Sequence, residues 1–158
     1  MPFALSRKYI LSFTCAAGLV ASLSPAHADD AKHQQENDAA RYRHTVMEAM
    51  GSSFGALALI MTNRVAKPDQ LATHAKALSL STSVVPTLFA EGSEGGDALP
   101  LIWQEQDKVA EAAKRAVDAT AALAEAAAAG DRATLAKAFK AAGESCKGCH
   151  ERYKAKDE

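Results

Sequence analysis

Two cysteines and a histidine form a tight group near the C-terminus. The run is Cys146-Lys147-Gly148-Cys149-His150, and the pattern C-x-x-C-H is the signature of c-type haem attachment. Each thiol adds across one vinyl group of a porphyrin, so both sulfurs must lie along one edge of the ring. His150 follows Cys146 by four residues, one helical turn, and can therefore place its imidazole under the iron as the proximal ligand.

Other uses of these two cysteines fit the sequence less well. A disulfide between residues three apart closes almost no loop and would stabilise the chain little. A zinc site needs a second Cys/His pair, whereas His33, His44 and His74 are scattered along the chain. A thioredoxin-like pair begins a helix after a strand, and this pair stands near the end of a chain without strand patterns. The sequence therefore predicts one covalent haem c, its iron ligated by the histidine of the motif.

The first 28 residues have the three parts of a secretory signal peptide. They comprise a basic start at Arg7 and Lys8, an apolar run over residues 9–20, and a small-residue cleavage site that ends at Ala28. The apolar run has about a dozen residues, fewer than the roughly 20 that a membrane-spanning helix needs. We expect cleavage after Ala28, which leaves residues 29–158 as a periplasmic domain without a membrane anchor.

The mature domain is slightly acidic and its size suits one domain. Removing residues 1–28 leaves 16 Lys and Arg against 19 Asp and Glu. The mature chain lacks the excess of basic residues that would indicate a nucleic-acid partner. Cys15 leaves with the signal peptide, so Cys146 and Cys149 are the only thiols of the mature chain.

The first two expected helices precede a glycine-rich loop. The first spans residues 30–62, and spacings of four and three define its inner face. That face comprises Arg43, Met47, Met50, Phe54 and Leu57, widened by Tyr42 and Val46. Gly51 and Gly55 interrupt this helix, where they would let a neighbouring helix or a flat ligand approach. A second, shorter helix begins at Pro68, and the loop runs from residue 89 to residue 96.

The last two expected helices are separated by Gly130 and Asp131, a C-terminal glycine and an N-cap. The third helix starts near Pro100 and is expected to turn inward Trp103, Ala110, Val117, Ala121 and Ala124. The fourth has an inner face formed by Leu135, Phe139, Ala142, Cys146, Cys149 and Tyr153. Four amphipathic helices predict an all-α fold, an antiparallel four-helix bundle with covalent haem c on the C-terminal helix.

The order of these features resembles the class II c-type cytochromes, the cytochrome c prime family. The resemblance covers essentially the whole mature chain, residues 29–158, and rests on segments 41–47, 50–57, 93–98, 102–103, 129–131 and 145–152. It implies a four-helix bundle with one haem on the last helix and the first helix over the distal face.

The resemblance also implies further contacts with the haem. It places Arg43 near a haem propionate, which suits a guanidinium because it can pair a carboxylate through two hydrogen bonds. A pair with Glu48 or another surface acid is the alternative for this arginine. His44 carries over as a weaker haem contact, and Ser93 and Glu94 carry over as a hydroxyl and an acid at the haem edge.

Met47 is placed by the resemblance closest to the iron on the distal side, and two interpretations stay open. A methionine sulfur bound to iron would give a six-coordinate, low-spin electron carrier. A methionine that only packs there, as methionines on a helix face often do, would leave a five-coordinate, high-spin haem that binds NO or CO. The loop from Ser93 to Asp97 is more similar to that of the high-spin members, which favours the five-coordinate form.

The function expected from the sequence is therefore gas binding, electron transfer, or both, by a periplasmic mono-haem cytochrome. Its partners would be redox proteins and small gases such as NO or CO. A haem-based reductase is the least supported alternative, because no acid–base pair accompanies the haem motif, and we expect no enzyme. Bundles of this family often pair through their first two helices, so both a homodimer and a monomer are compatible with the sequence.

Overall fold

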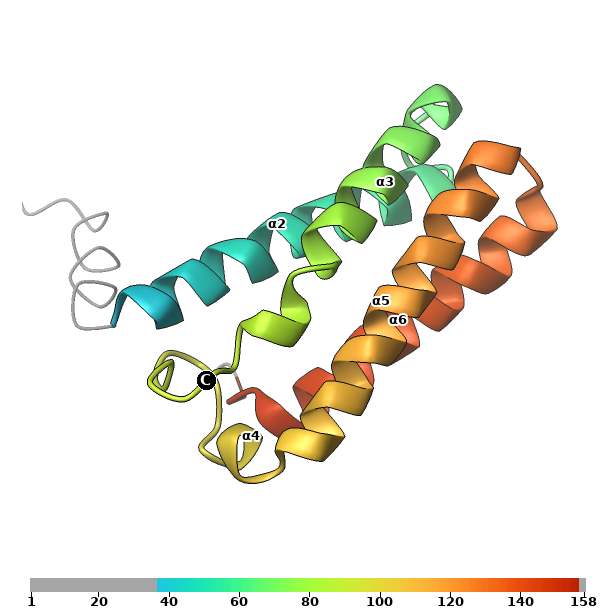
Figure 1. Ribbon diagram of the computed structural model, residues 1–158. Coiled ribbons are helices and arrows are strands. Elements are labelled where there is room, and N and C mark those ends of the chain that lie inside the picture. Colours follow the sequence, from blue (N-terminus) through green and yellow to red (C-terminus); the bar gives the residue numbers. More distant parts are fainter. Residues whose placement is uncertain (1–36, 157–158) are drawn as a thin grey trace, which may run out of the picture.

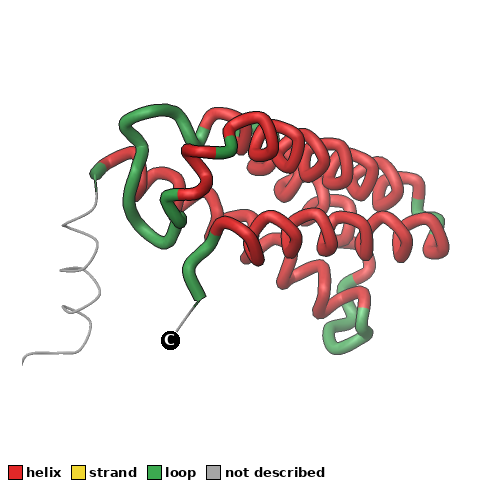
Figure 2. The backbone as a smooth tube through the Cα atoms, turned by 90° about the horizontal axis from the view of Figure 1, so that it is seen from below, coloured by secondary structure: helices red, strands yellow, loops and turns green. Residues whose placement is uncertain are grey.

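The computed structural model describes residues 37–156. Their helices, α2 to α6, are joined by turns and loops (Figures 1 and 2). None of these helices combines the length and the apolar character that a membrane crossing requires. The expected signal peptide, Cys15 and His33 lie outside the described residues.

Helix α2 spans Asp38–Met61 and begins later than the sequence pattern predicted. Asn37 has an extended backbone, and its side chain accepts a hydrogen bond from the backbone N–H of Ala40 at 2.8 Å. This N-cap satisfies a free donor of the first turn and starts the helix at Asp38 rather than at residue 30.

The predicted inner face of α2 is confirmed with one exception. Arg43 and Leu57 are buried, and Met47, Met50 and Phe54 are partly buried between them. Tyr42, expected to widen this face, is instead 57% exposed. The space beside Gly51 and Gly55 is open, because a Cβ added at either position would meet no described atom within 4 Å. Among the described residues 37–156, no neighbouring helix packs closely against either glycine.

The second segment begins with a single 3-10 turn, Pro68–Gln70, which continues into α3, Leu71–Thr82. Pro68 occupies the first turn, as predicted, because its missing N–H would be unpaired there in any case. A second 3-10 turn, Val85–Thr87, follows α3. The chain then enters the expected loop, which extends to Pro100.

The third segment is broken, where the sequence predicted one helix from Pro100. Helix α4 spans Leu101–Gln104 and α5 spans Gln106–Ala129, with Glu105 between them at φ −116° and ψ 44°. Gly130 ends α5 with φ 75°, the left-handed conformation expected of a C-terminal glycine.

The inner face of α5 differs from the predicted one by one position. Ala110 is exposed, and Val117, Ala121 and Ala124 are only partly buried. The buried face consists of Val109, Ala112, Ala113, Ala116, Thr120, Leu123, Ala126 and Ala127. Alanines surround this helix on all sides, so the hydrophobic period could not fix which of them face the core.

Helix α6 spans Arg132–Tyr153 and matches its prediction closely. The side chain of Asp131 accepts hydrogen bonds from the backbone N–H groups of Ala133 and Thr134, which confirms the predicted N-cap. Leu135, Ala142 and Tyr153 are buried, and both cysteines are partly buried on the same face.

Helices α2, α3, α5 and α6 form an antiparallel four-helix bundle, with α5 packed against both α3 and α6 (Figure 1). We call the end with the α2–α3 and α5–α6 turns the closed end. Its core comprises Leu57, Ala75, Leu78, Leu123, Ala126, Ala127, Leu135 and Ala142. We call the opposite end the open end. Its core comprises Val85, Leu88, Phe89, Ile102, Val109, Ala113 and Tyr153, and it includes α4 and the loop before it.

Candidate functional site

A cavity of about 590 Å³, including its mouth, lies at the open end between α2, α6 and the loop. A second cavity of about 420 Å³ shares four lining residues with the first. The four shared residues are Met47, Phe89, Cys149 and His150. Cys146 lines the second cavity, so the structure brings the predicted cysteines, histidine and methionine together.

Both cysteines of α6 are free thiols and are partly buried. Burial raises the pKa of each thiol above its ordinary value, and for Cys149 the neighbouring Cys146 raises it further. Because the two residues are three apart on one helix, their sulfurs lie on the same face. That face carries two thiols beside apolar space, which fits a flat macrocycle joined to the helix along one edge.

His150 lines both cavities although much of the residue is exposed to solvent. Partial burial of its imidazole lowers its pKa, and the positive charge of Lys154 lowers it further. The neutral imidazole is thereby favoured, and this is the form that ligates a metal ion. Met47 of α2 lines the same cavities, so a thioether and an imidazole from two different helices reach the same space.

Arg43 is 5% exposed and ties α2 to the loop. Its Nη1 donates to the carbonyl oxygen of Ser93 at 2.6 Å and to that of Leu88 at 3.4 Å. Its Nη2 donates to the carbonyl oxygen of Gly95 at 2.5 Å. The guanidinium also lies over the ring of Trp103, 5.4 Å from its centroid. Arg43 lines the larger cavity from this fixed position.

His44, not Arg43, pairs with Glu48 among the described contacts of this turn. The His44 Nε2 lies 3.3 Å from the Glu48 Oε1. His44 also lines the larger cavity, together with Asp97 and Lys154 from the loop and the end of α6. Arg43 and Lys154 therefore bring positive charge to the lining of this cavity, and Asp97 brings negative charge.

Ser93 and Glu94 do not belong to the lining of either cavity. The Ser93 hydroxyl donates to the carbonyl oxygen of Ala90 at 2.6 Å and accepts from Trp103 Nε1 at 3.3 Å. Glu94 accepts a hydrogen bond from the backbone N–H of Gly92 at 3.2 Å. The loop lines the larger cavity with residues 96–98 instead. A contact of Ser93 or Glu94 with the haem stays a prediction.

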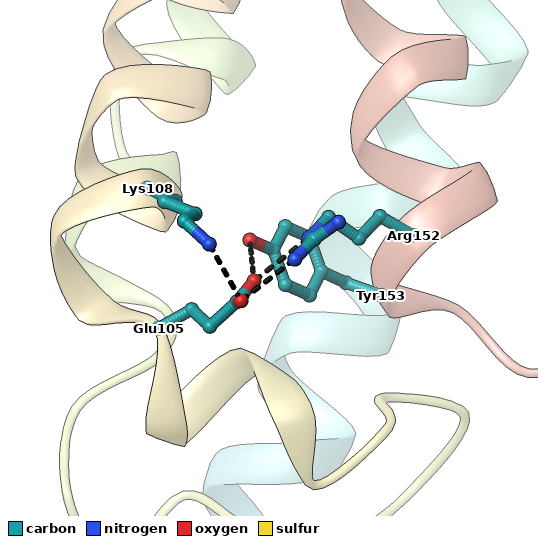
Figure 3. A network of polar contacts seen from close by, with 4 residues as sticks. All are labelled: Glu105, Lys108, Arg152 and Tyr153. Atoms are coloured by element: carbon teal, nitrogen blue, oxygen red, sulfur yellow. Dashed lines mark hydrogen bonds and ion pairs between the residues drawn. The ribbon is translucent and has the colours of Figure 1, made fainter.

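A polar cluster that the sequence did not predict joins the α4–α5 break to the end of α6 (Figure 3). Glu105 accepts hydrogen bonds from Arg152 Nε at 2.7 Å, Arg152 Nη2 at 2.6 Å, the Tyr153 hydroxyl at 2.8 Å and Lys108 Nζ at 2.8 Å. Arg152, followed by Lys108 and Tyr153, lowers the pKa of this carboxyl to about 2. No sequence pattern connects Glu105 with Arg152, because 47 residues separate them.

Known proteins are similar to this chain in sequence and in fold. Residues 38–154 match the family model described as Cytochrome C′. The chain is 35% identical over 116 residues to a cytochrome c′ of Pararhodospirillum photometricum, which covers 72% of this chain and 93% of that protein. It is 40% identical over 119 residues to a cytochrome c-556 of Agrobacterium fabrum, covering 72% of this chain and 79% of that protein.

A solved structure of cytochrome c prime from Alcaligenes xylosoxidans matches the bundle with a TM-score of 0.71 and 32% identity. The match covers 76% of this chain and 95% of that one. The matched structure is a ferrous variant with bound NO.

Proposed function

Because this chain belongs to the cytochrome c′ family, we propose that it is a periplasmic mono-haem cytochrome with a five-coordinate, high-spin iron that binds NO or CO. The observation that carries the proposal is the pair of adjoining cavities, which residues of the Cys-x-x-Cys-His motif on α6 and Met47 of α2 line together. Held covalently at this site, haem c would supply the iron that binds the diatomic gas.

Cys146, Cys149 and His150 would hold this cofactor on α6. Two free, partly buried thiols on the inner face support the attachment, since each would form a thioether to one edge of the ring. The lowered pKa of His150 supports its role as the proximal ligand, because the imidazole is then neutral and able to bind iron. Apolar residues of the open-end core, including Phe89 and Ile102, would exclude water from the ring.

Met47 would cover the distal side without binding the iron. It lines both cavities on the apolar face of α2, and a methionine on such a face more often packs against its neighbours than binds a metal. The relative of known structure that carries bound NO gives this interpretation further support. Arg43 would orient the cofactor by pairing with a propionate, while its hydrogen bonds to the loop hold it in place. His44 would lie beside that propionate at the mouth of the cavity.

An electron carrier with Met47 as the distal ligand is the second candidate. The shared lining by Met47 and His150 favours it, since a methionine and a histidine that both bind the iron give a six-coordinate haem. In either case redox proteins would exchange electrons with the iron, and we expect no enzyme activity.

The proposal also includes export to the periplasm and the formation of a homodimer. Residues 1–28 would direct the chain to the periplasm and be removed, leaving residues 29–158 as the mature domain. A homodimer through α2 and α3 is supported by exposed apolar side chains on and between these helices. They are Tyr42, Leu59, Val65 and Leu80, which are 40–62% exposed.

Mapping of peptides from the purified holoprotein tests the attachment. We expect the peptide that contains both Cys146 and Cys149 to carry the mass of one haem after digestion, joined through two thioether bonds. Haem that acidified acetone extracts from the protein would contradict covalent attachment, because only a non-covalent haem leaves under those conditions.

Two methionine variants distinguish the candidates. Met47→Ala should leave the absorption spectrum high-spin and close to that of the unmodified protein if the iron is five-coordinate. Met50→Ala is the matched control, because Met50 lies on the same face of α2 but lines only the second, smaller cavity. A low-spin spectrum that Met47→Ala alone abolishes would establish the electron-carrier candidate instead.

A further inference from the structure

The cluster of Glu105, Arg152 and Tyr153 joins the break between α4 and α5 to the turn of α6 that carries His150, the candidate proximal ligand. The backbone of Glu105 is held firmly at that break. Its backbone N–H donates to the carbonyl oxygen of Leu101 at 3.1 Å, and its carbonyl oxygen accepts from the N–H of Val109 at 3.0 Å. The residue is thus bonded into both α4 and α5, at the break between them. Its side chain is only 17% exposed.

The carboxylate of Glu105 engages α6 through both oxygens. Arg152 donates from Nε to one oxygen and from Nη2 to the other, a two-point contact that fixes direction as well as distance. The Tyr153 hydroxyl donates to the oxygen that Arg152 Nε also contacts. Lys108, on the first turns of α5, donates to the other oxygen and holds the carboxylate from its own side (Figure 3).

The residues that Glu105 holds lie within one turn of His150. Arg152 and Tyr153 follow His150 by two and three positions, and the Lys154 N–H donates to the His150 carbonyl oxygen at 3.0 Å. The backbone of the same turn is also joined to the loop, since the Leu99 N–H donates to the Tyr153 carbonyl oxygen at 2.8 Å. Tyr153 is 4% exposed and lines the larger cavity together with His150.

The last turn of α6 is therefore held on two sides, by its backbone against the loop and by its side chains against Glu105. A tilt or rotation of this turn would move the imidazole of His150, because the helix is stiff over a single turn. Without the Glu105 contacts, the backbone pairing with the loop would be left to resist such a movement.

We propose that Glu105, acting through Arg152 and Tyr153, is a positioning residue for His150 and sets the strength of the bond between that imidazole and the iron. The inference rests on the proposed function, in which His150 is the proximal ligand. It concerns the orientation of the ligand and leaves the thioether attachment unchanged, since neither cysteine contacts the cluster by a hydrogen bond among the described residues.

The test is the iron–histidine stretching band in the resonance Raman spectrum of the reduced holoprotein. Glu105→Gln keeps the size of the side chain but removes its charge and one acceptor oxygen, and it should shift or broaden the band at a temperature where the protein is folded. Tyr153→Phe should shift the band less, because Arg152 still holds the carboxylate. Asp118→Asn is the matched control, since it breaks an exposed ion pair with Lys114 at 2.6 Å on α5, and it should leave the band in place.

The outcomes separate the two proposals. A band that is identical in Glu105→Gln and in the unmodified protein, with only a lower melting temperature in the variant, would overturn the positioning role. A shift of equal size in Asp118→Asn would also overturn it. The absence of the band from the unmodified reduced protein would contradict five-coordinate ligation by His150, and the positioning role would then fail with the proposed function.

Discussion

The closed end and the open end of the bundle differ in how their space is filled. At the closed end, Leu57 and Leu123 are fully buried and side chains fill the core. The Phe54 and Phe139 rings stack with centroids 4.6 Å apart and planes 8° from parallel. A Cβ added at Gly143 would lie 3.1 Å from the Phe54 ring, so even a methyl group has little room there.

The open end has an apolar core of its own, but cavities adjoin that core and polar contacts join its segments. Arg43 bonds the loop to α2, and Glu105 bonds α4 and α5 to α6. Charge-assisted hydrogen bonds fix the direction and distance between the groups that they join, whereas apolar burial is non-directional. The difference indicates that one end supplies stability while the other keeps space for a ligand.

Loss of Cys149 should have the largest effect, and it should act on the open end alone. Cys149→Ala, produced in a host that exports the protein and attaches haem, should yield little stably haemylated protein, because one thioether is lost. Yield is measured from the haem absorbance of the purified protein. Cys15→Ala is the matched control and should leave the yield unchanged, since we expect this cysteine to leave with the signal peptide. Abundant normal holoprotein from Cys149→Ala would contradict the attachment.

A cavity introduced at the closed end should reduce stability without altering the haem. Leu123→Ala removes a fully buried side chain and should lower the free energy of unfolding by about 2–5 kcal/mol. Guanidinium unfolding followed by circular dichroism measures the loss. The absorption spectrum of the folded variant should match that of the unmodified protein. A changed spin state in this variant would show that the two ends are not independent.

Gly130 offers a smaller perturbation of the closed end. Its φ of 75° is in the left-handed region, where a residue with a Cβ costs roughly 1–2 kcal/mol. Gly130→Ala should therefore lower the free energy of unfolding by about that amount, again with an unchanged spectrum. A variant as stable as the unmodified protein would show that the α5–α6 turn relaxes at no cost.

The smallest effect expected is a pH dependence that arises at the open end. The pKa of Glu105 is lowered from 4.5 to about 2 by its hydrogen bonds, chiefly from Arg152. A lowered pKa in the folded state stabilises the protein above the unfolded pKa, and this contribution disappears as the pH falls through the folded pKa. The melting temperature of Glu105→Gln should therefore lie below that of the unmodified protein at neutral pH. The difference should shrink between about pH 4.5 and pH 2, and a constant difference over that range would contradict the lowered pKa.

The sequence predicted those parts of the fold that local signals specify. Asp131 and Gly130 mark a helix start and a helix end through their own backbone chemistry, and both predictions are confirmed. The prediction of the inner face of α6 was correct because Leu135 and Tyr153 are large apolar residues with polar neighbours in the sequence. In α5 the same reasoning failed, since exposed Ala110 and buried Ala113 are chemically identical.

The residues of the candidate site also fall into those that the sequence predicts and those that only the fold brings together. The cysteines and His150 are recognisable because their spacing within one helical turn is itself the signal. Glu105 and Arg152 are common surface residue types, and only the folded chain brings them together. For Ser93, a family resemblance supplied the expectation, whereas the hydroxyl is engaged within its own loop and with Trp103.

The absorption spectrum of the reduced protein, recorded before and after the addition of carbon monoxide, tests the central claim most directly. Haem held by His150 with an open distal position predicts a high-spin spectrum that carbon monoxide converts to that of an adduct. A sharp low-spin α-band that carbon monoxide leaves unmoved would contradict the account, because a second ligand would then occupy the position assigned to the gas.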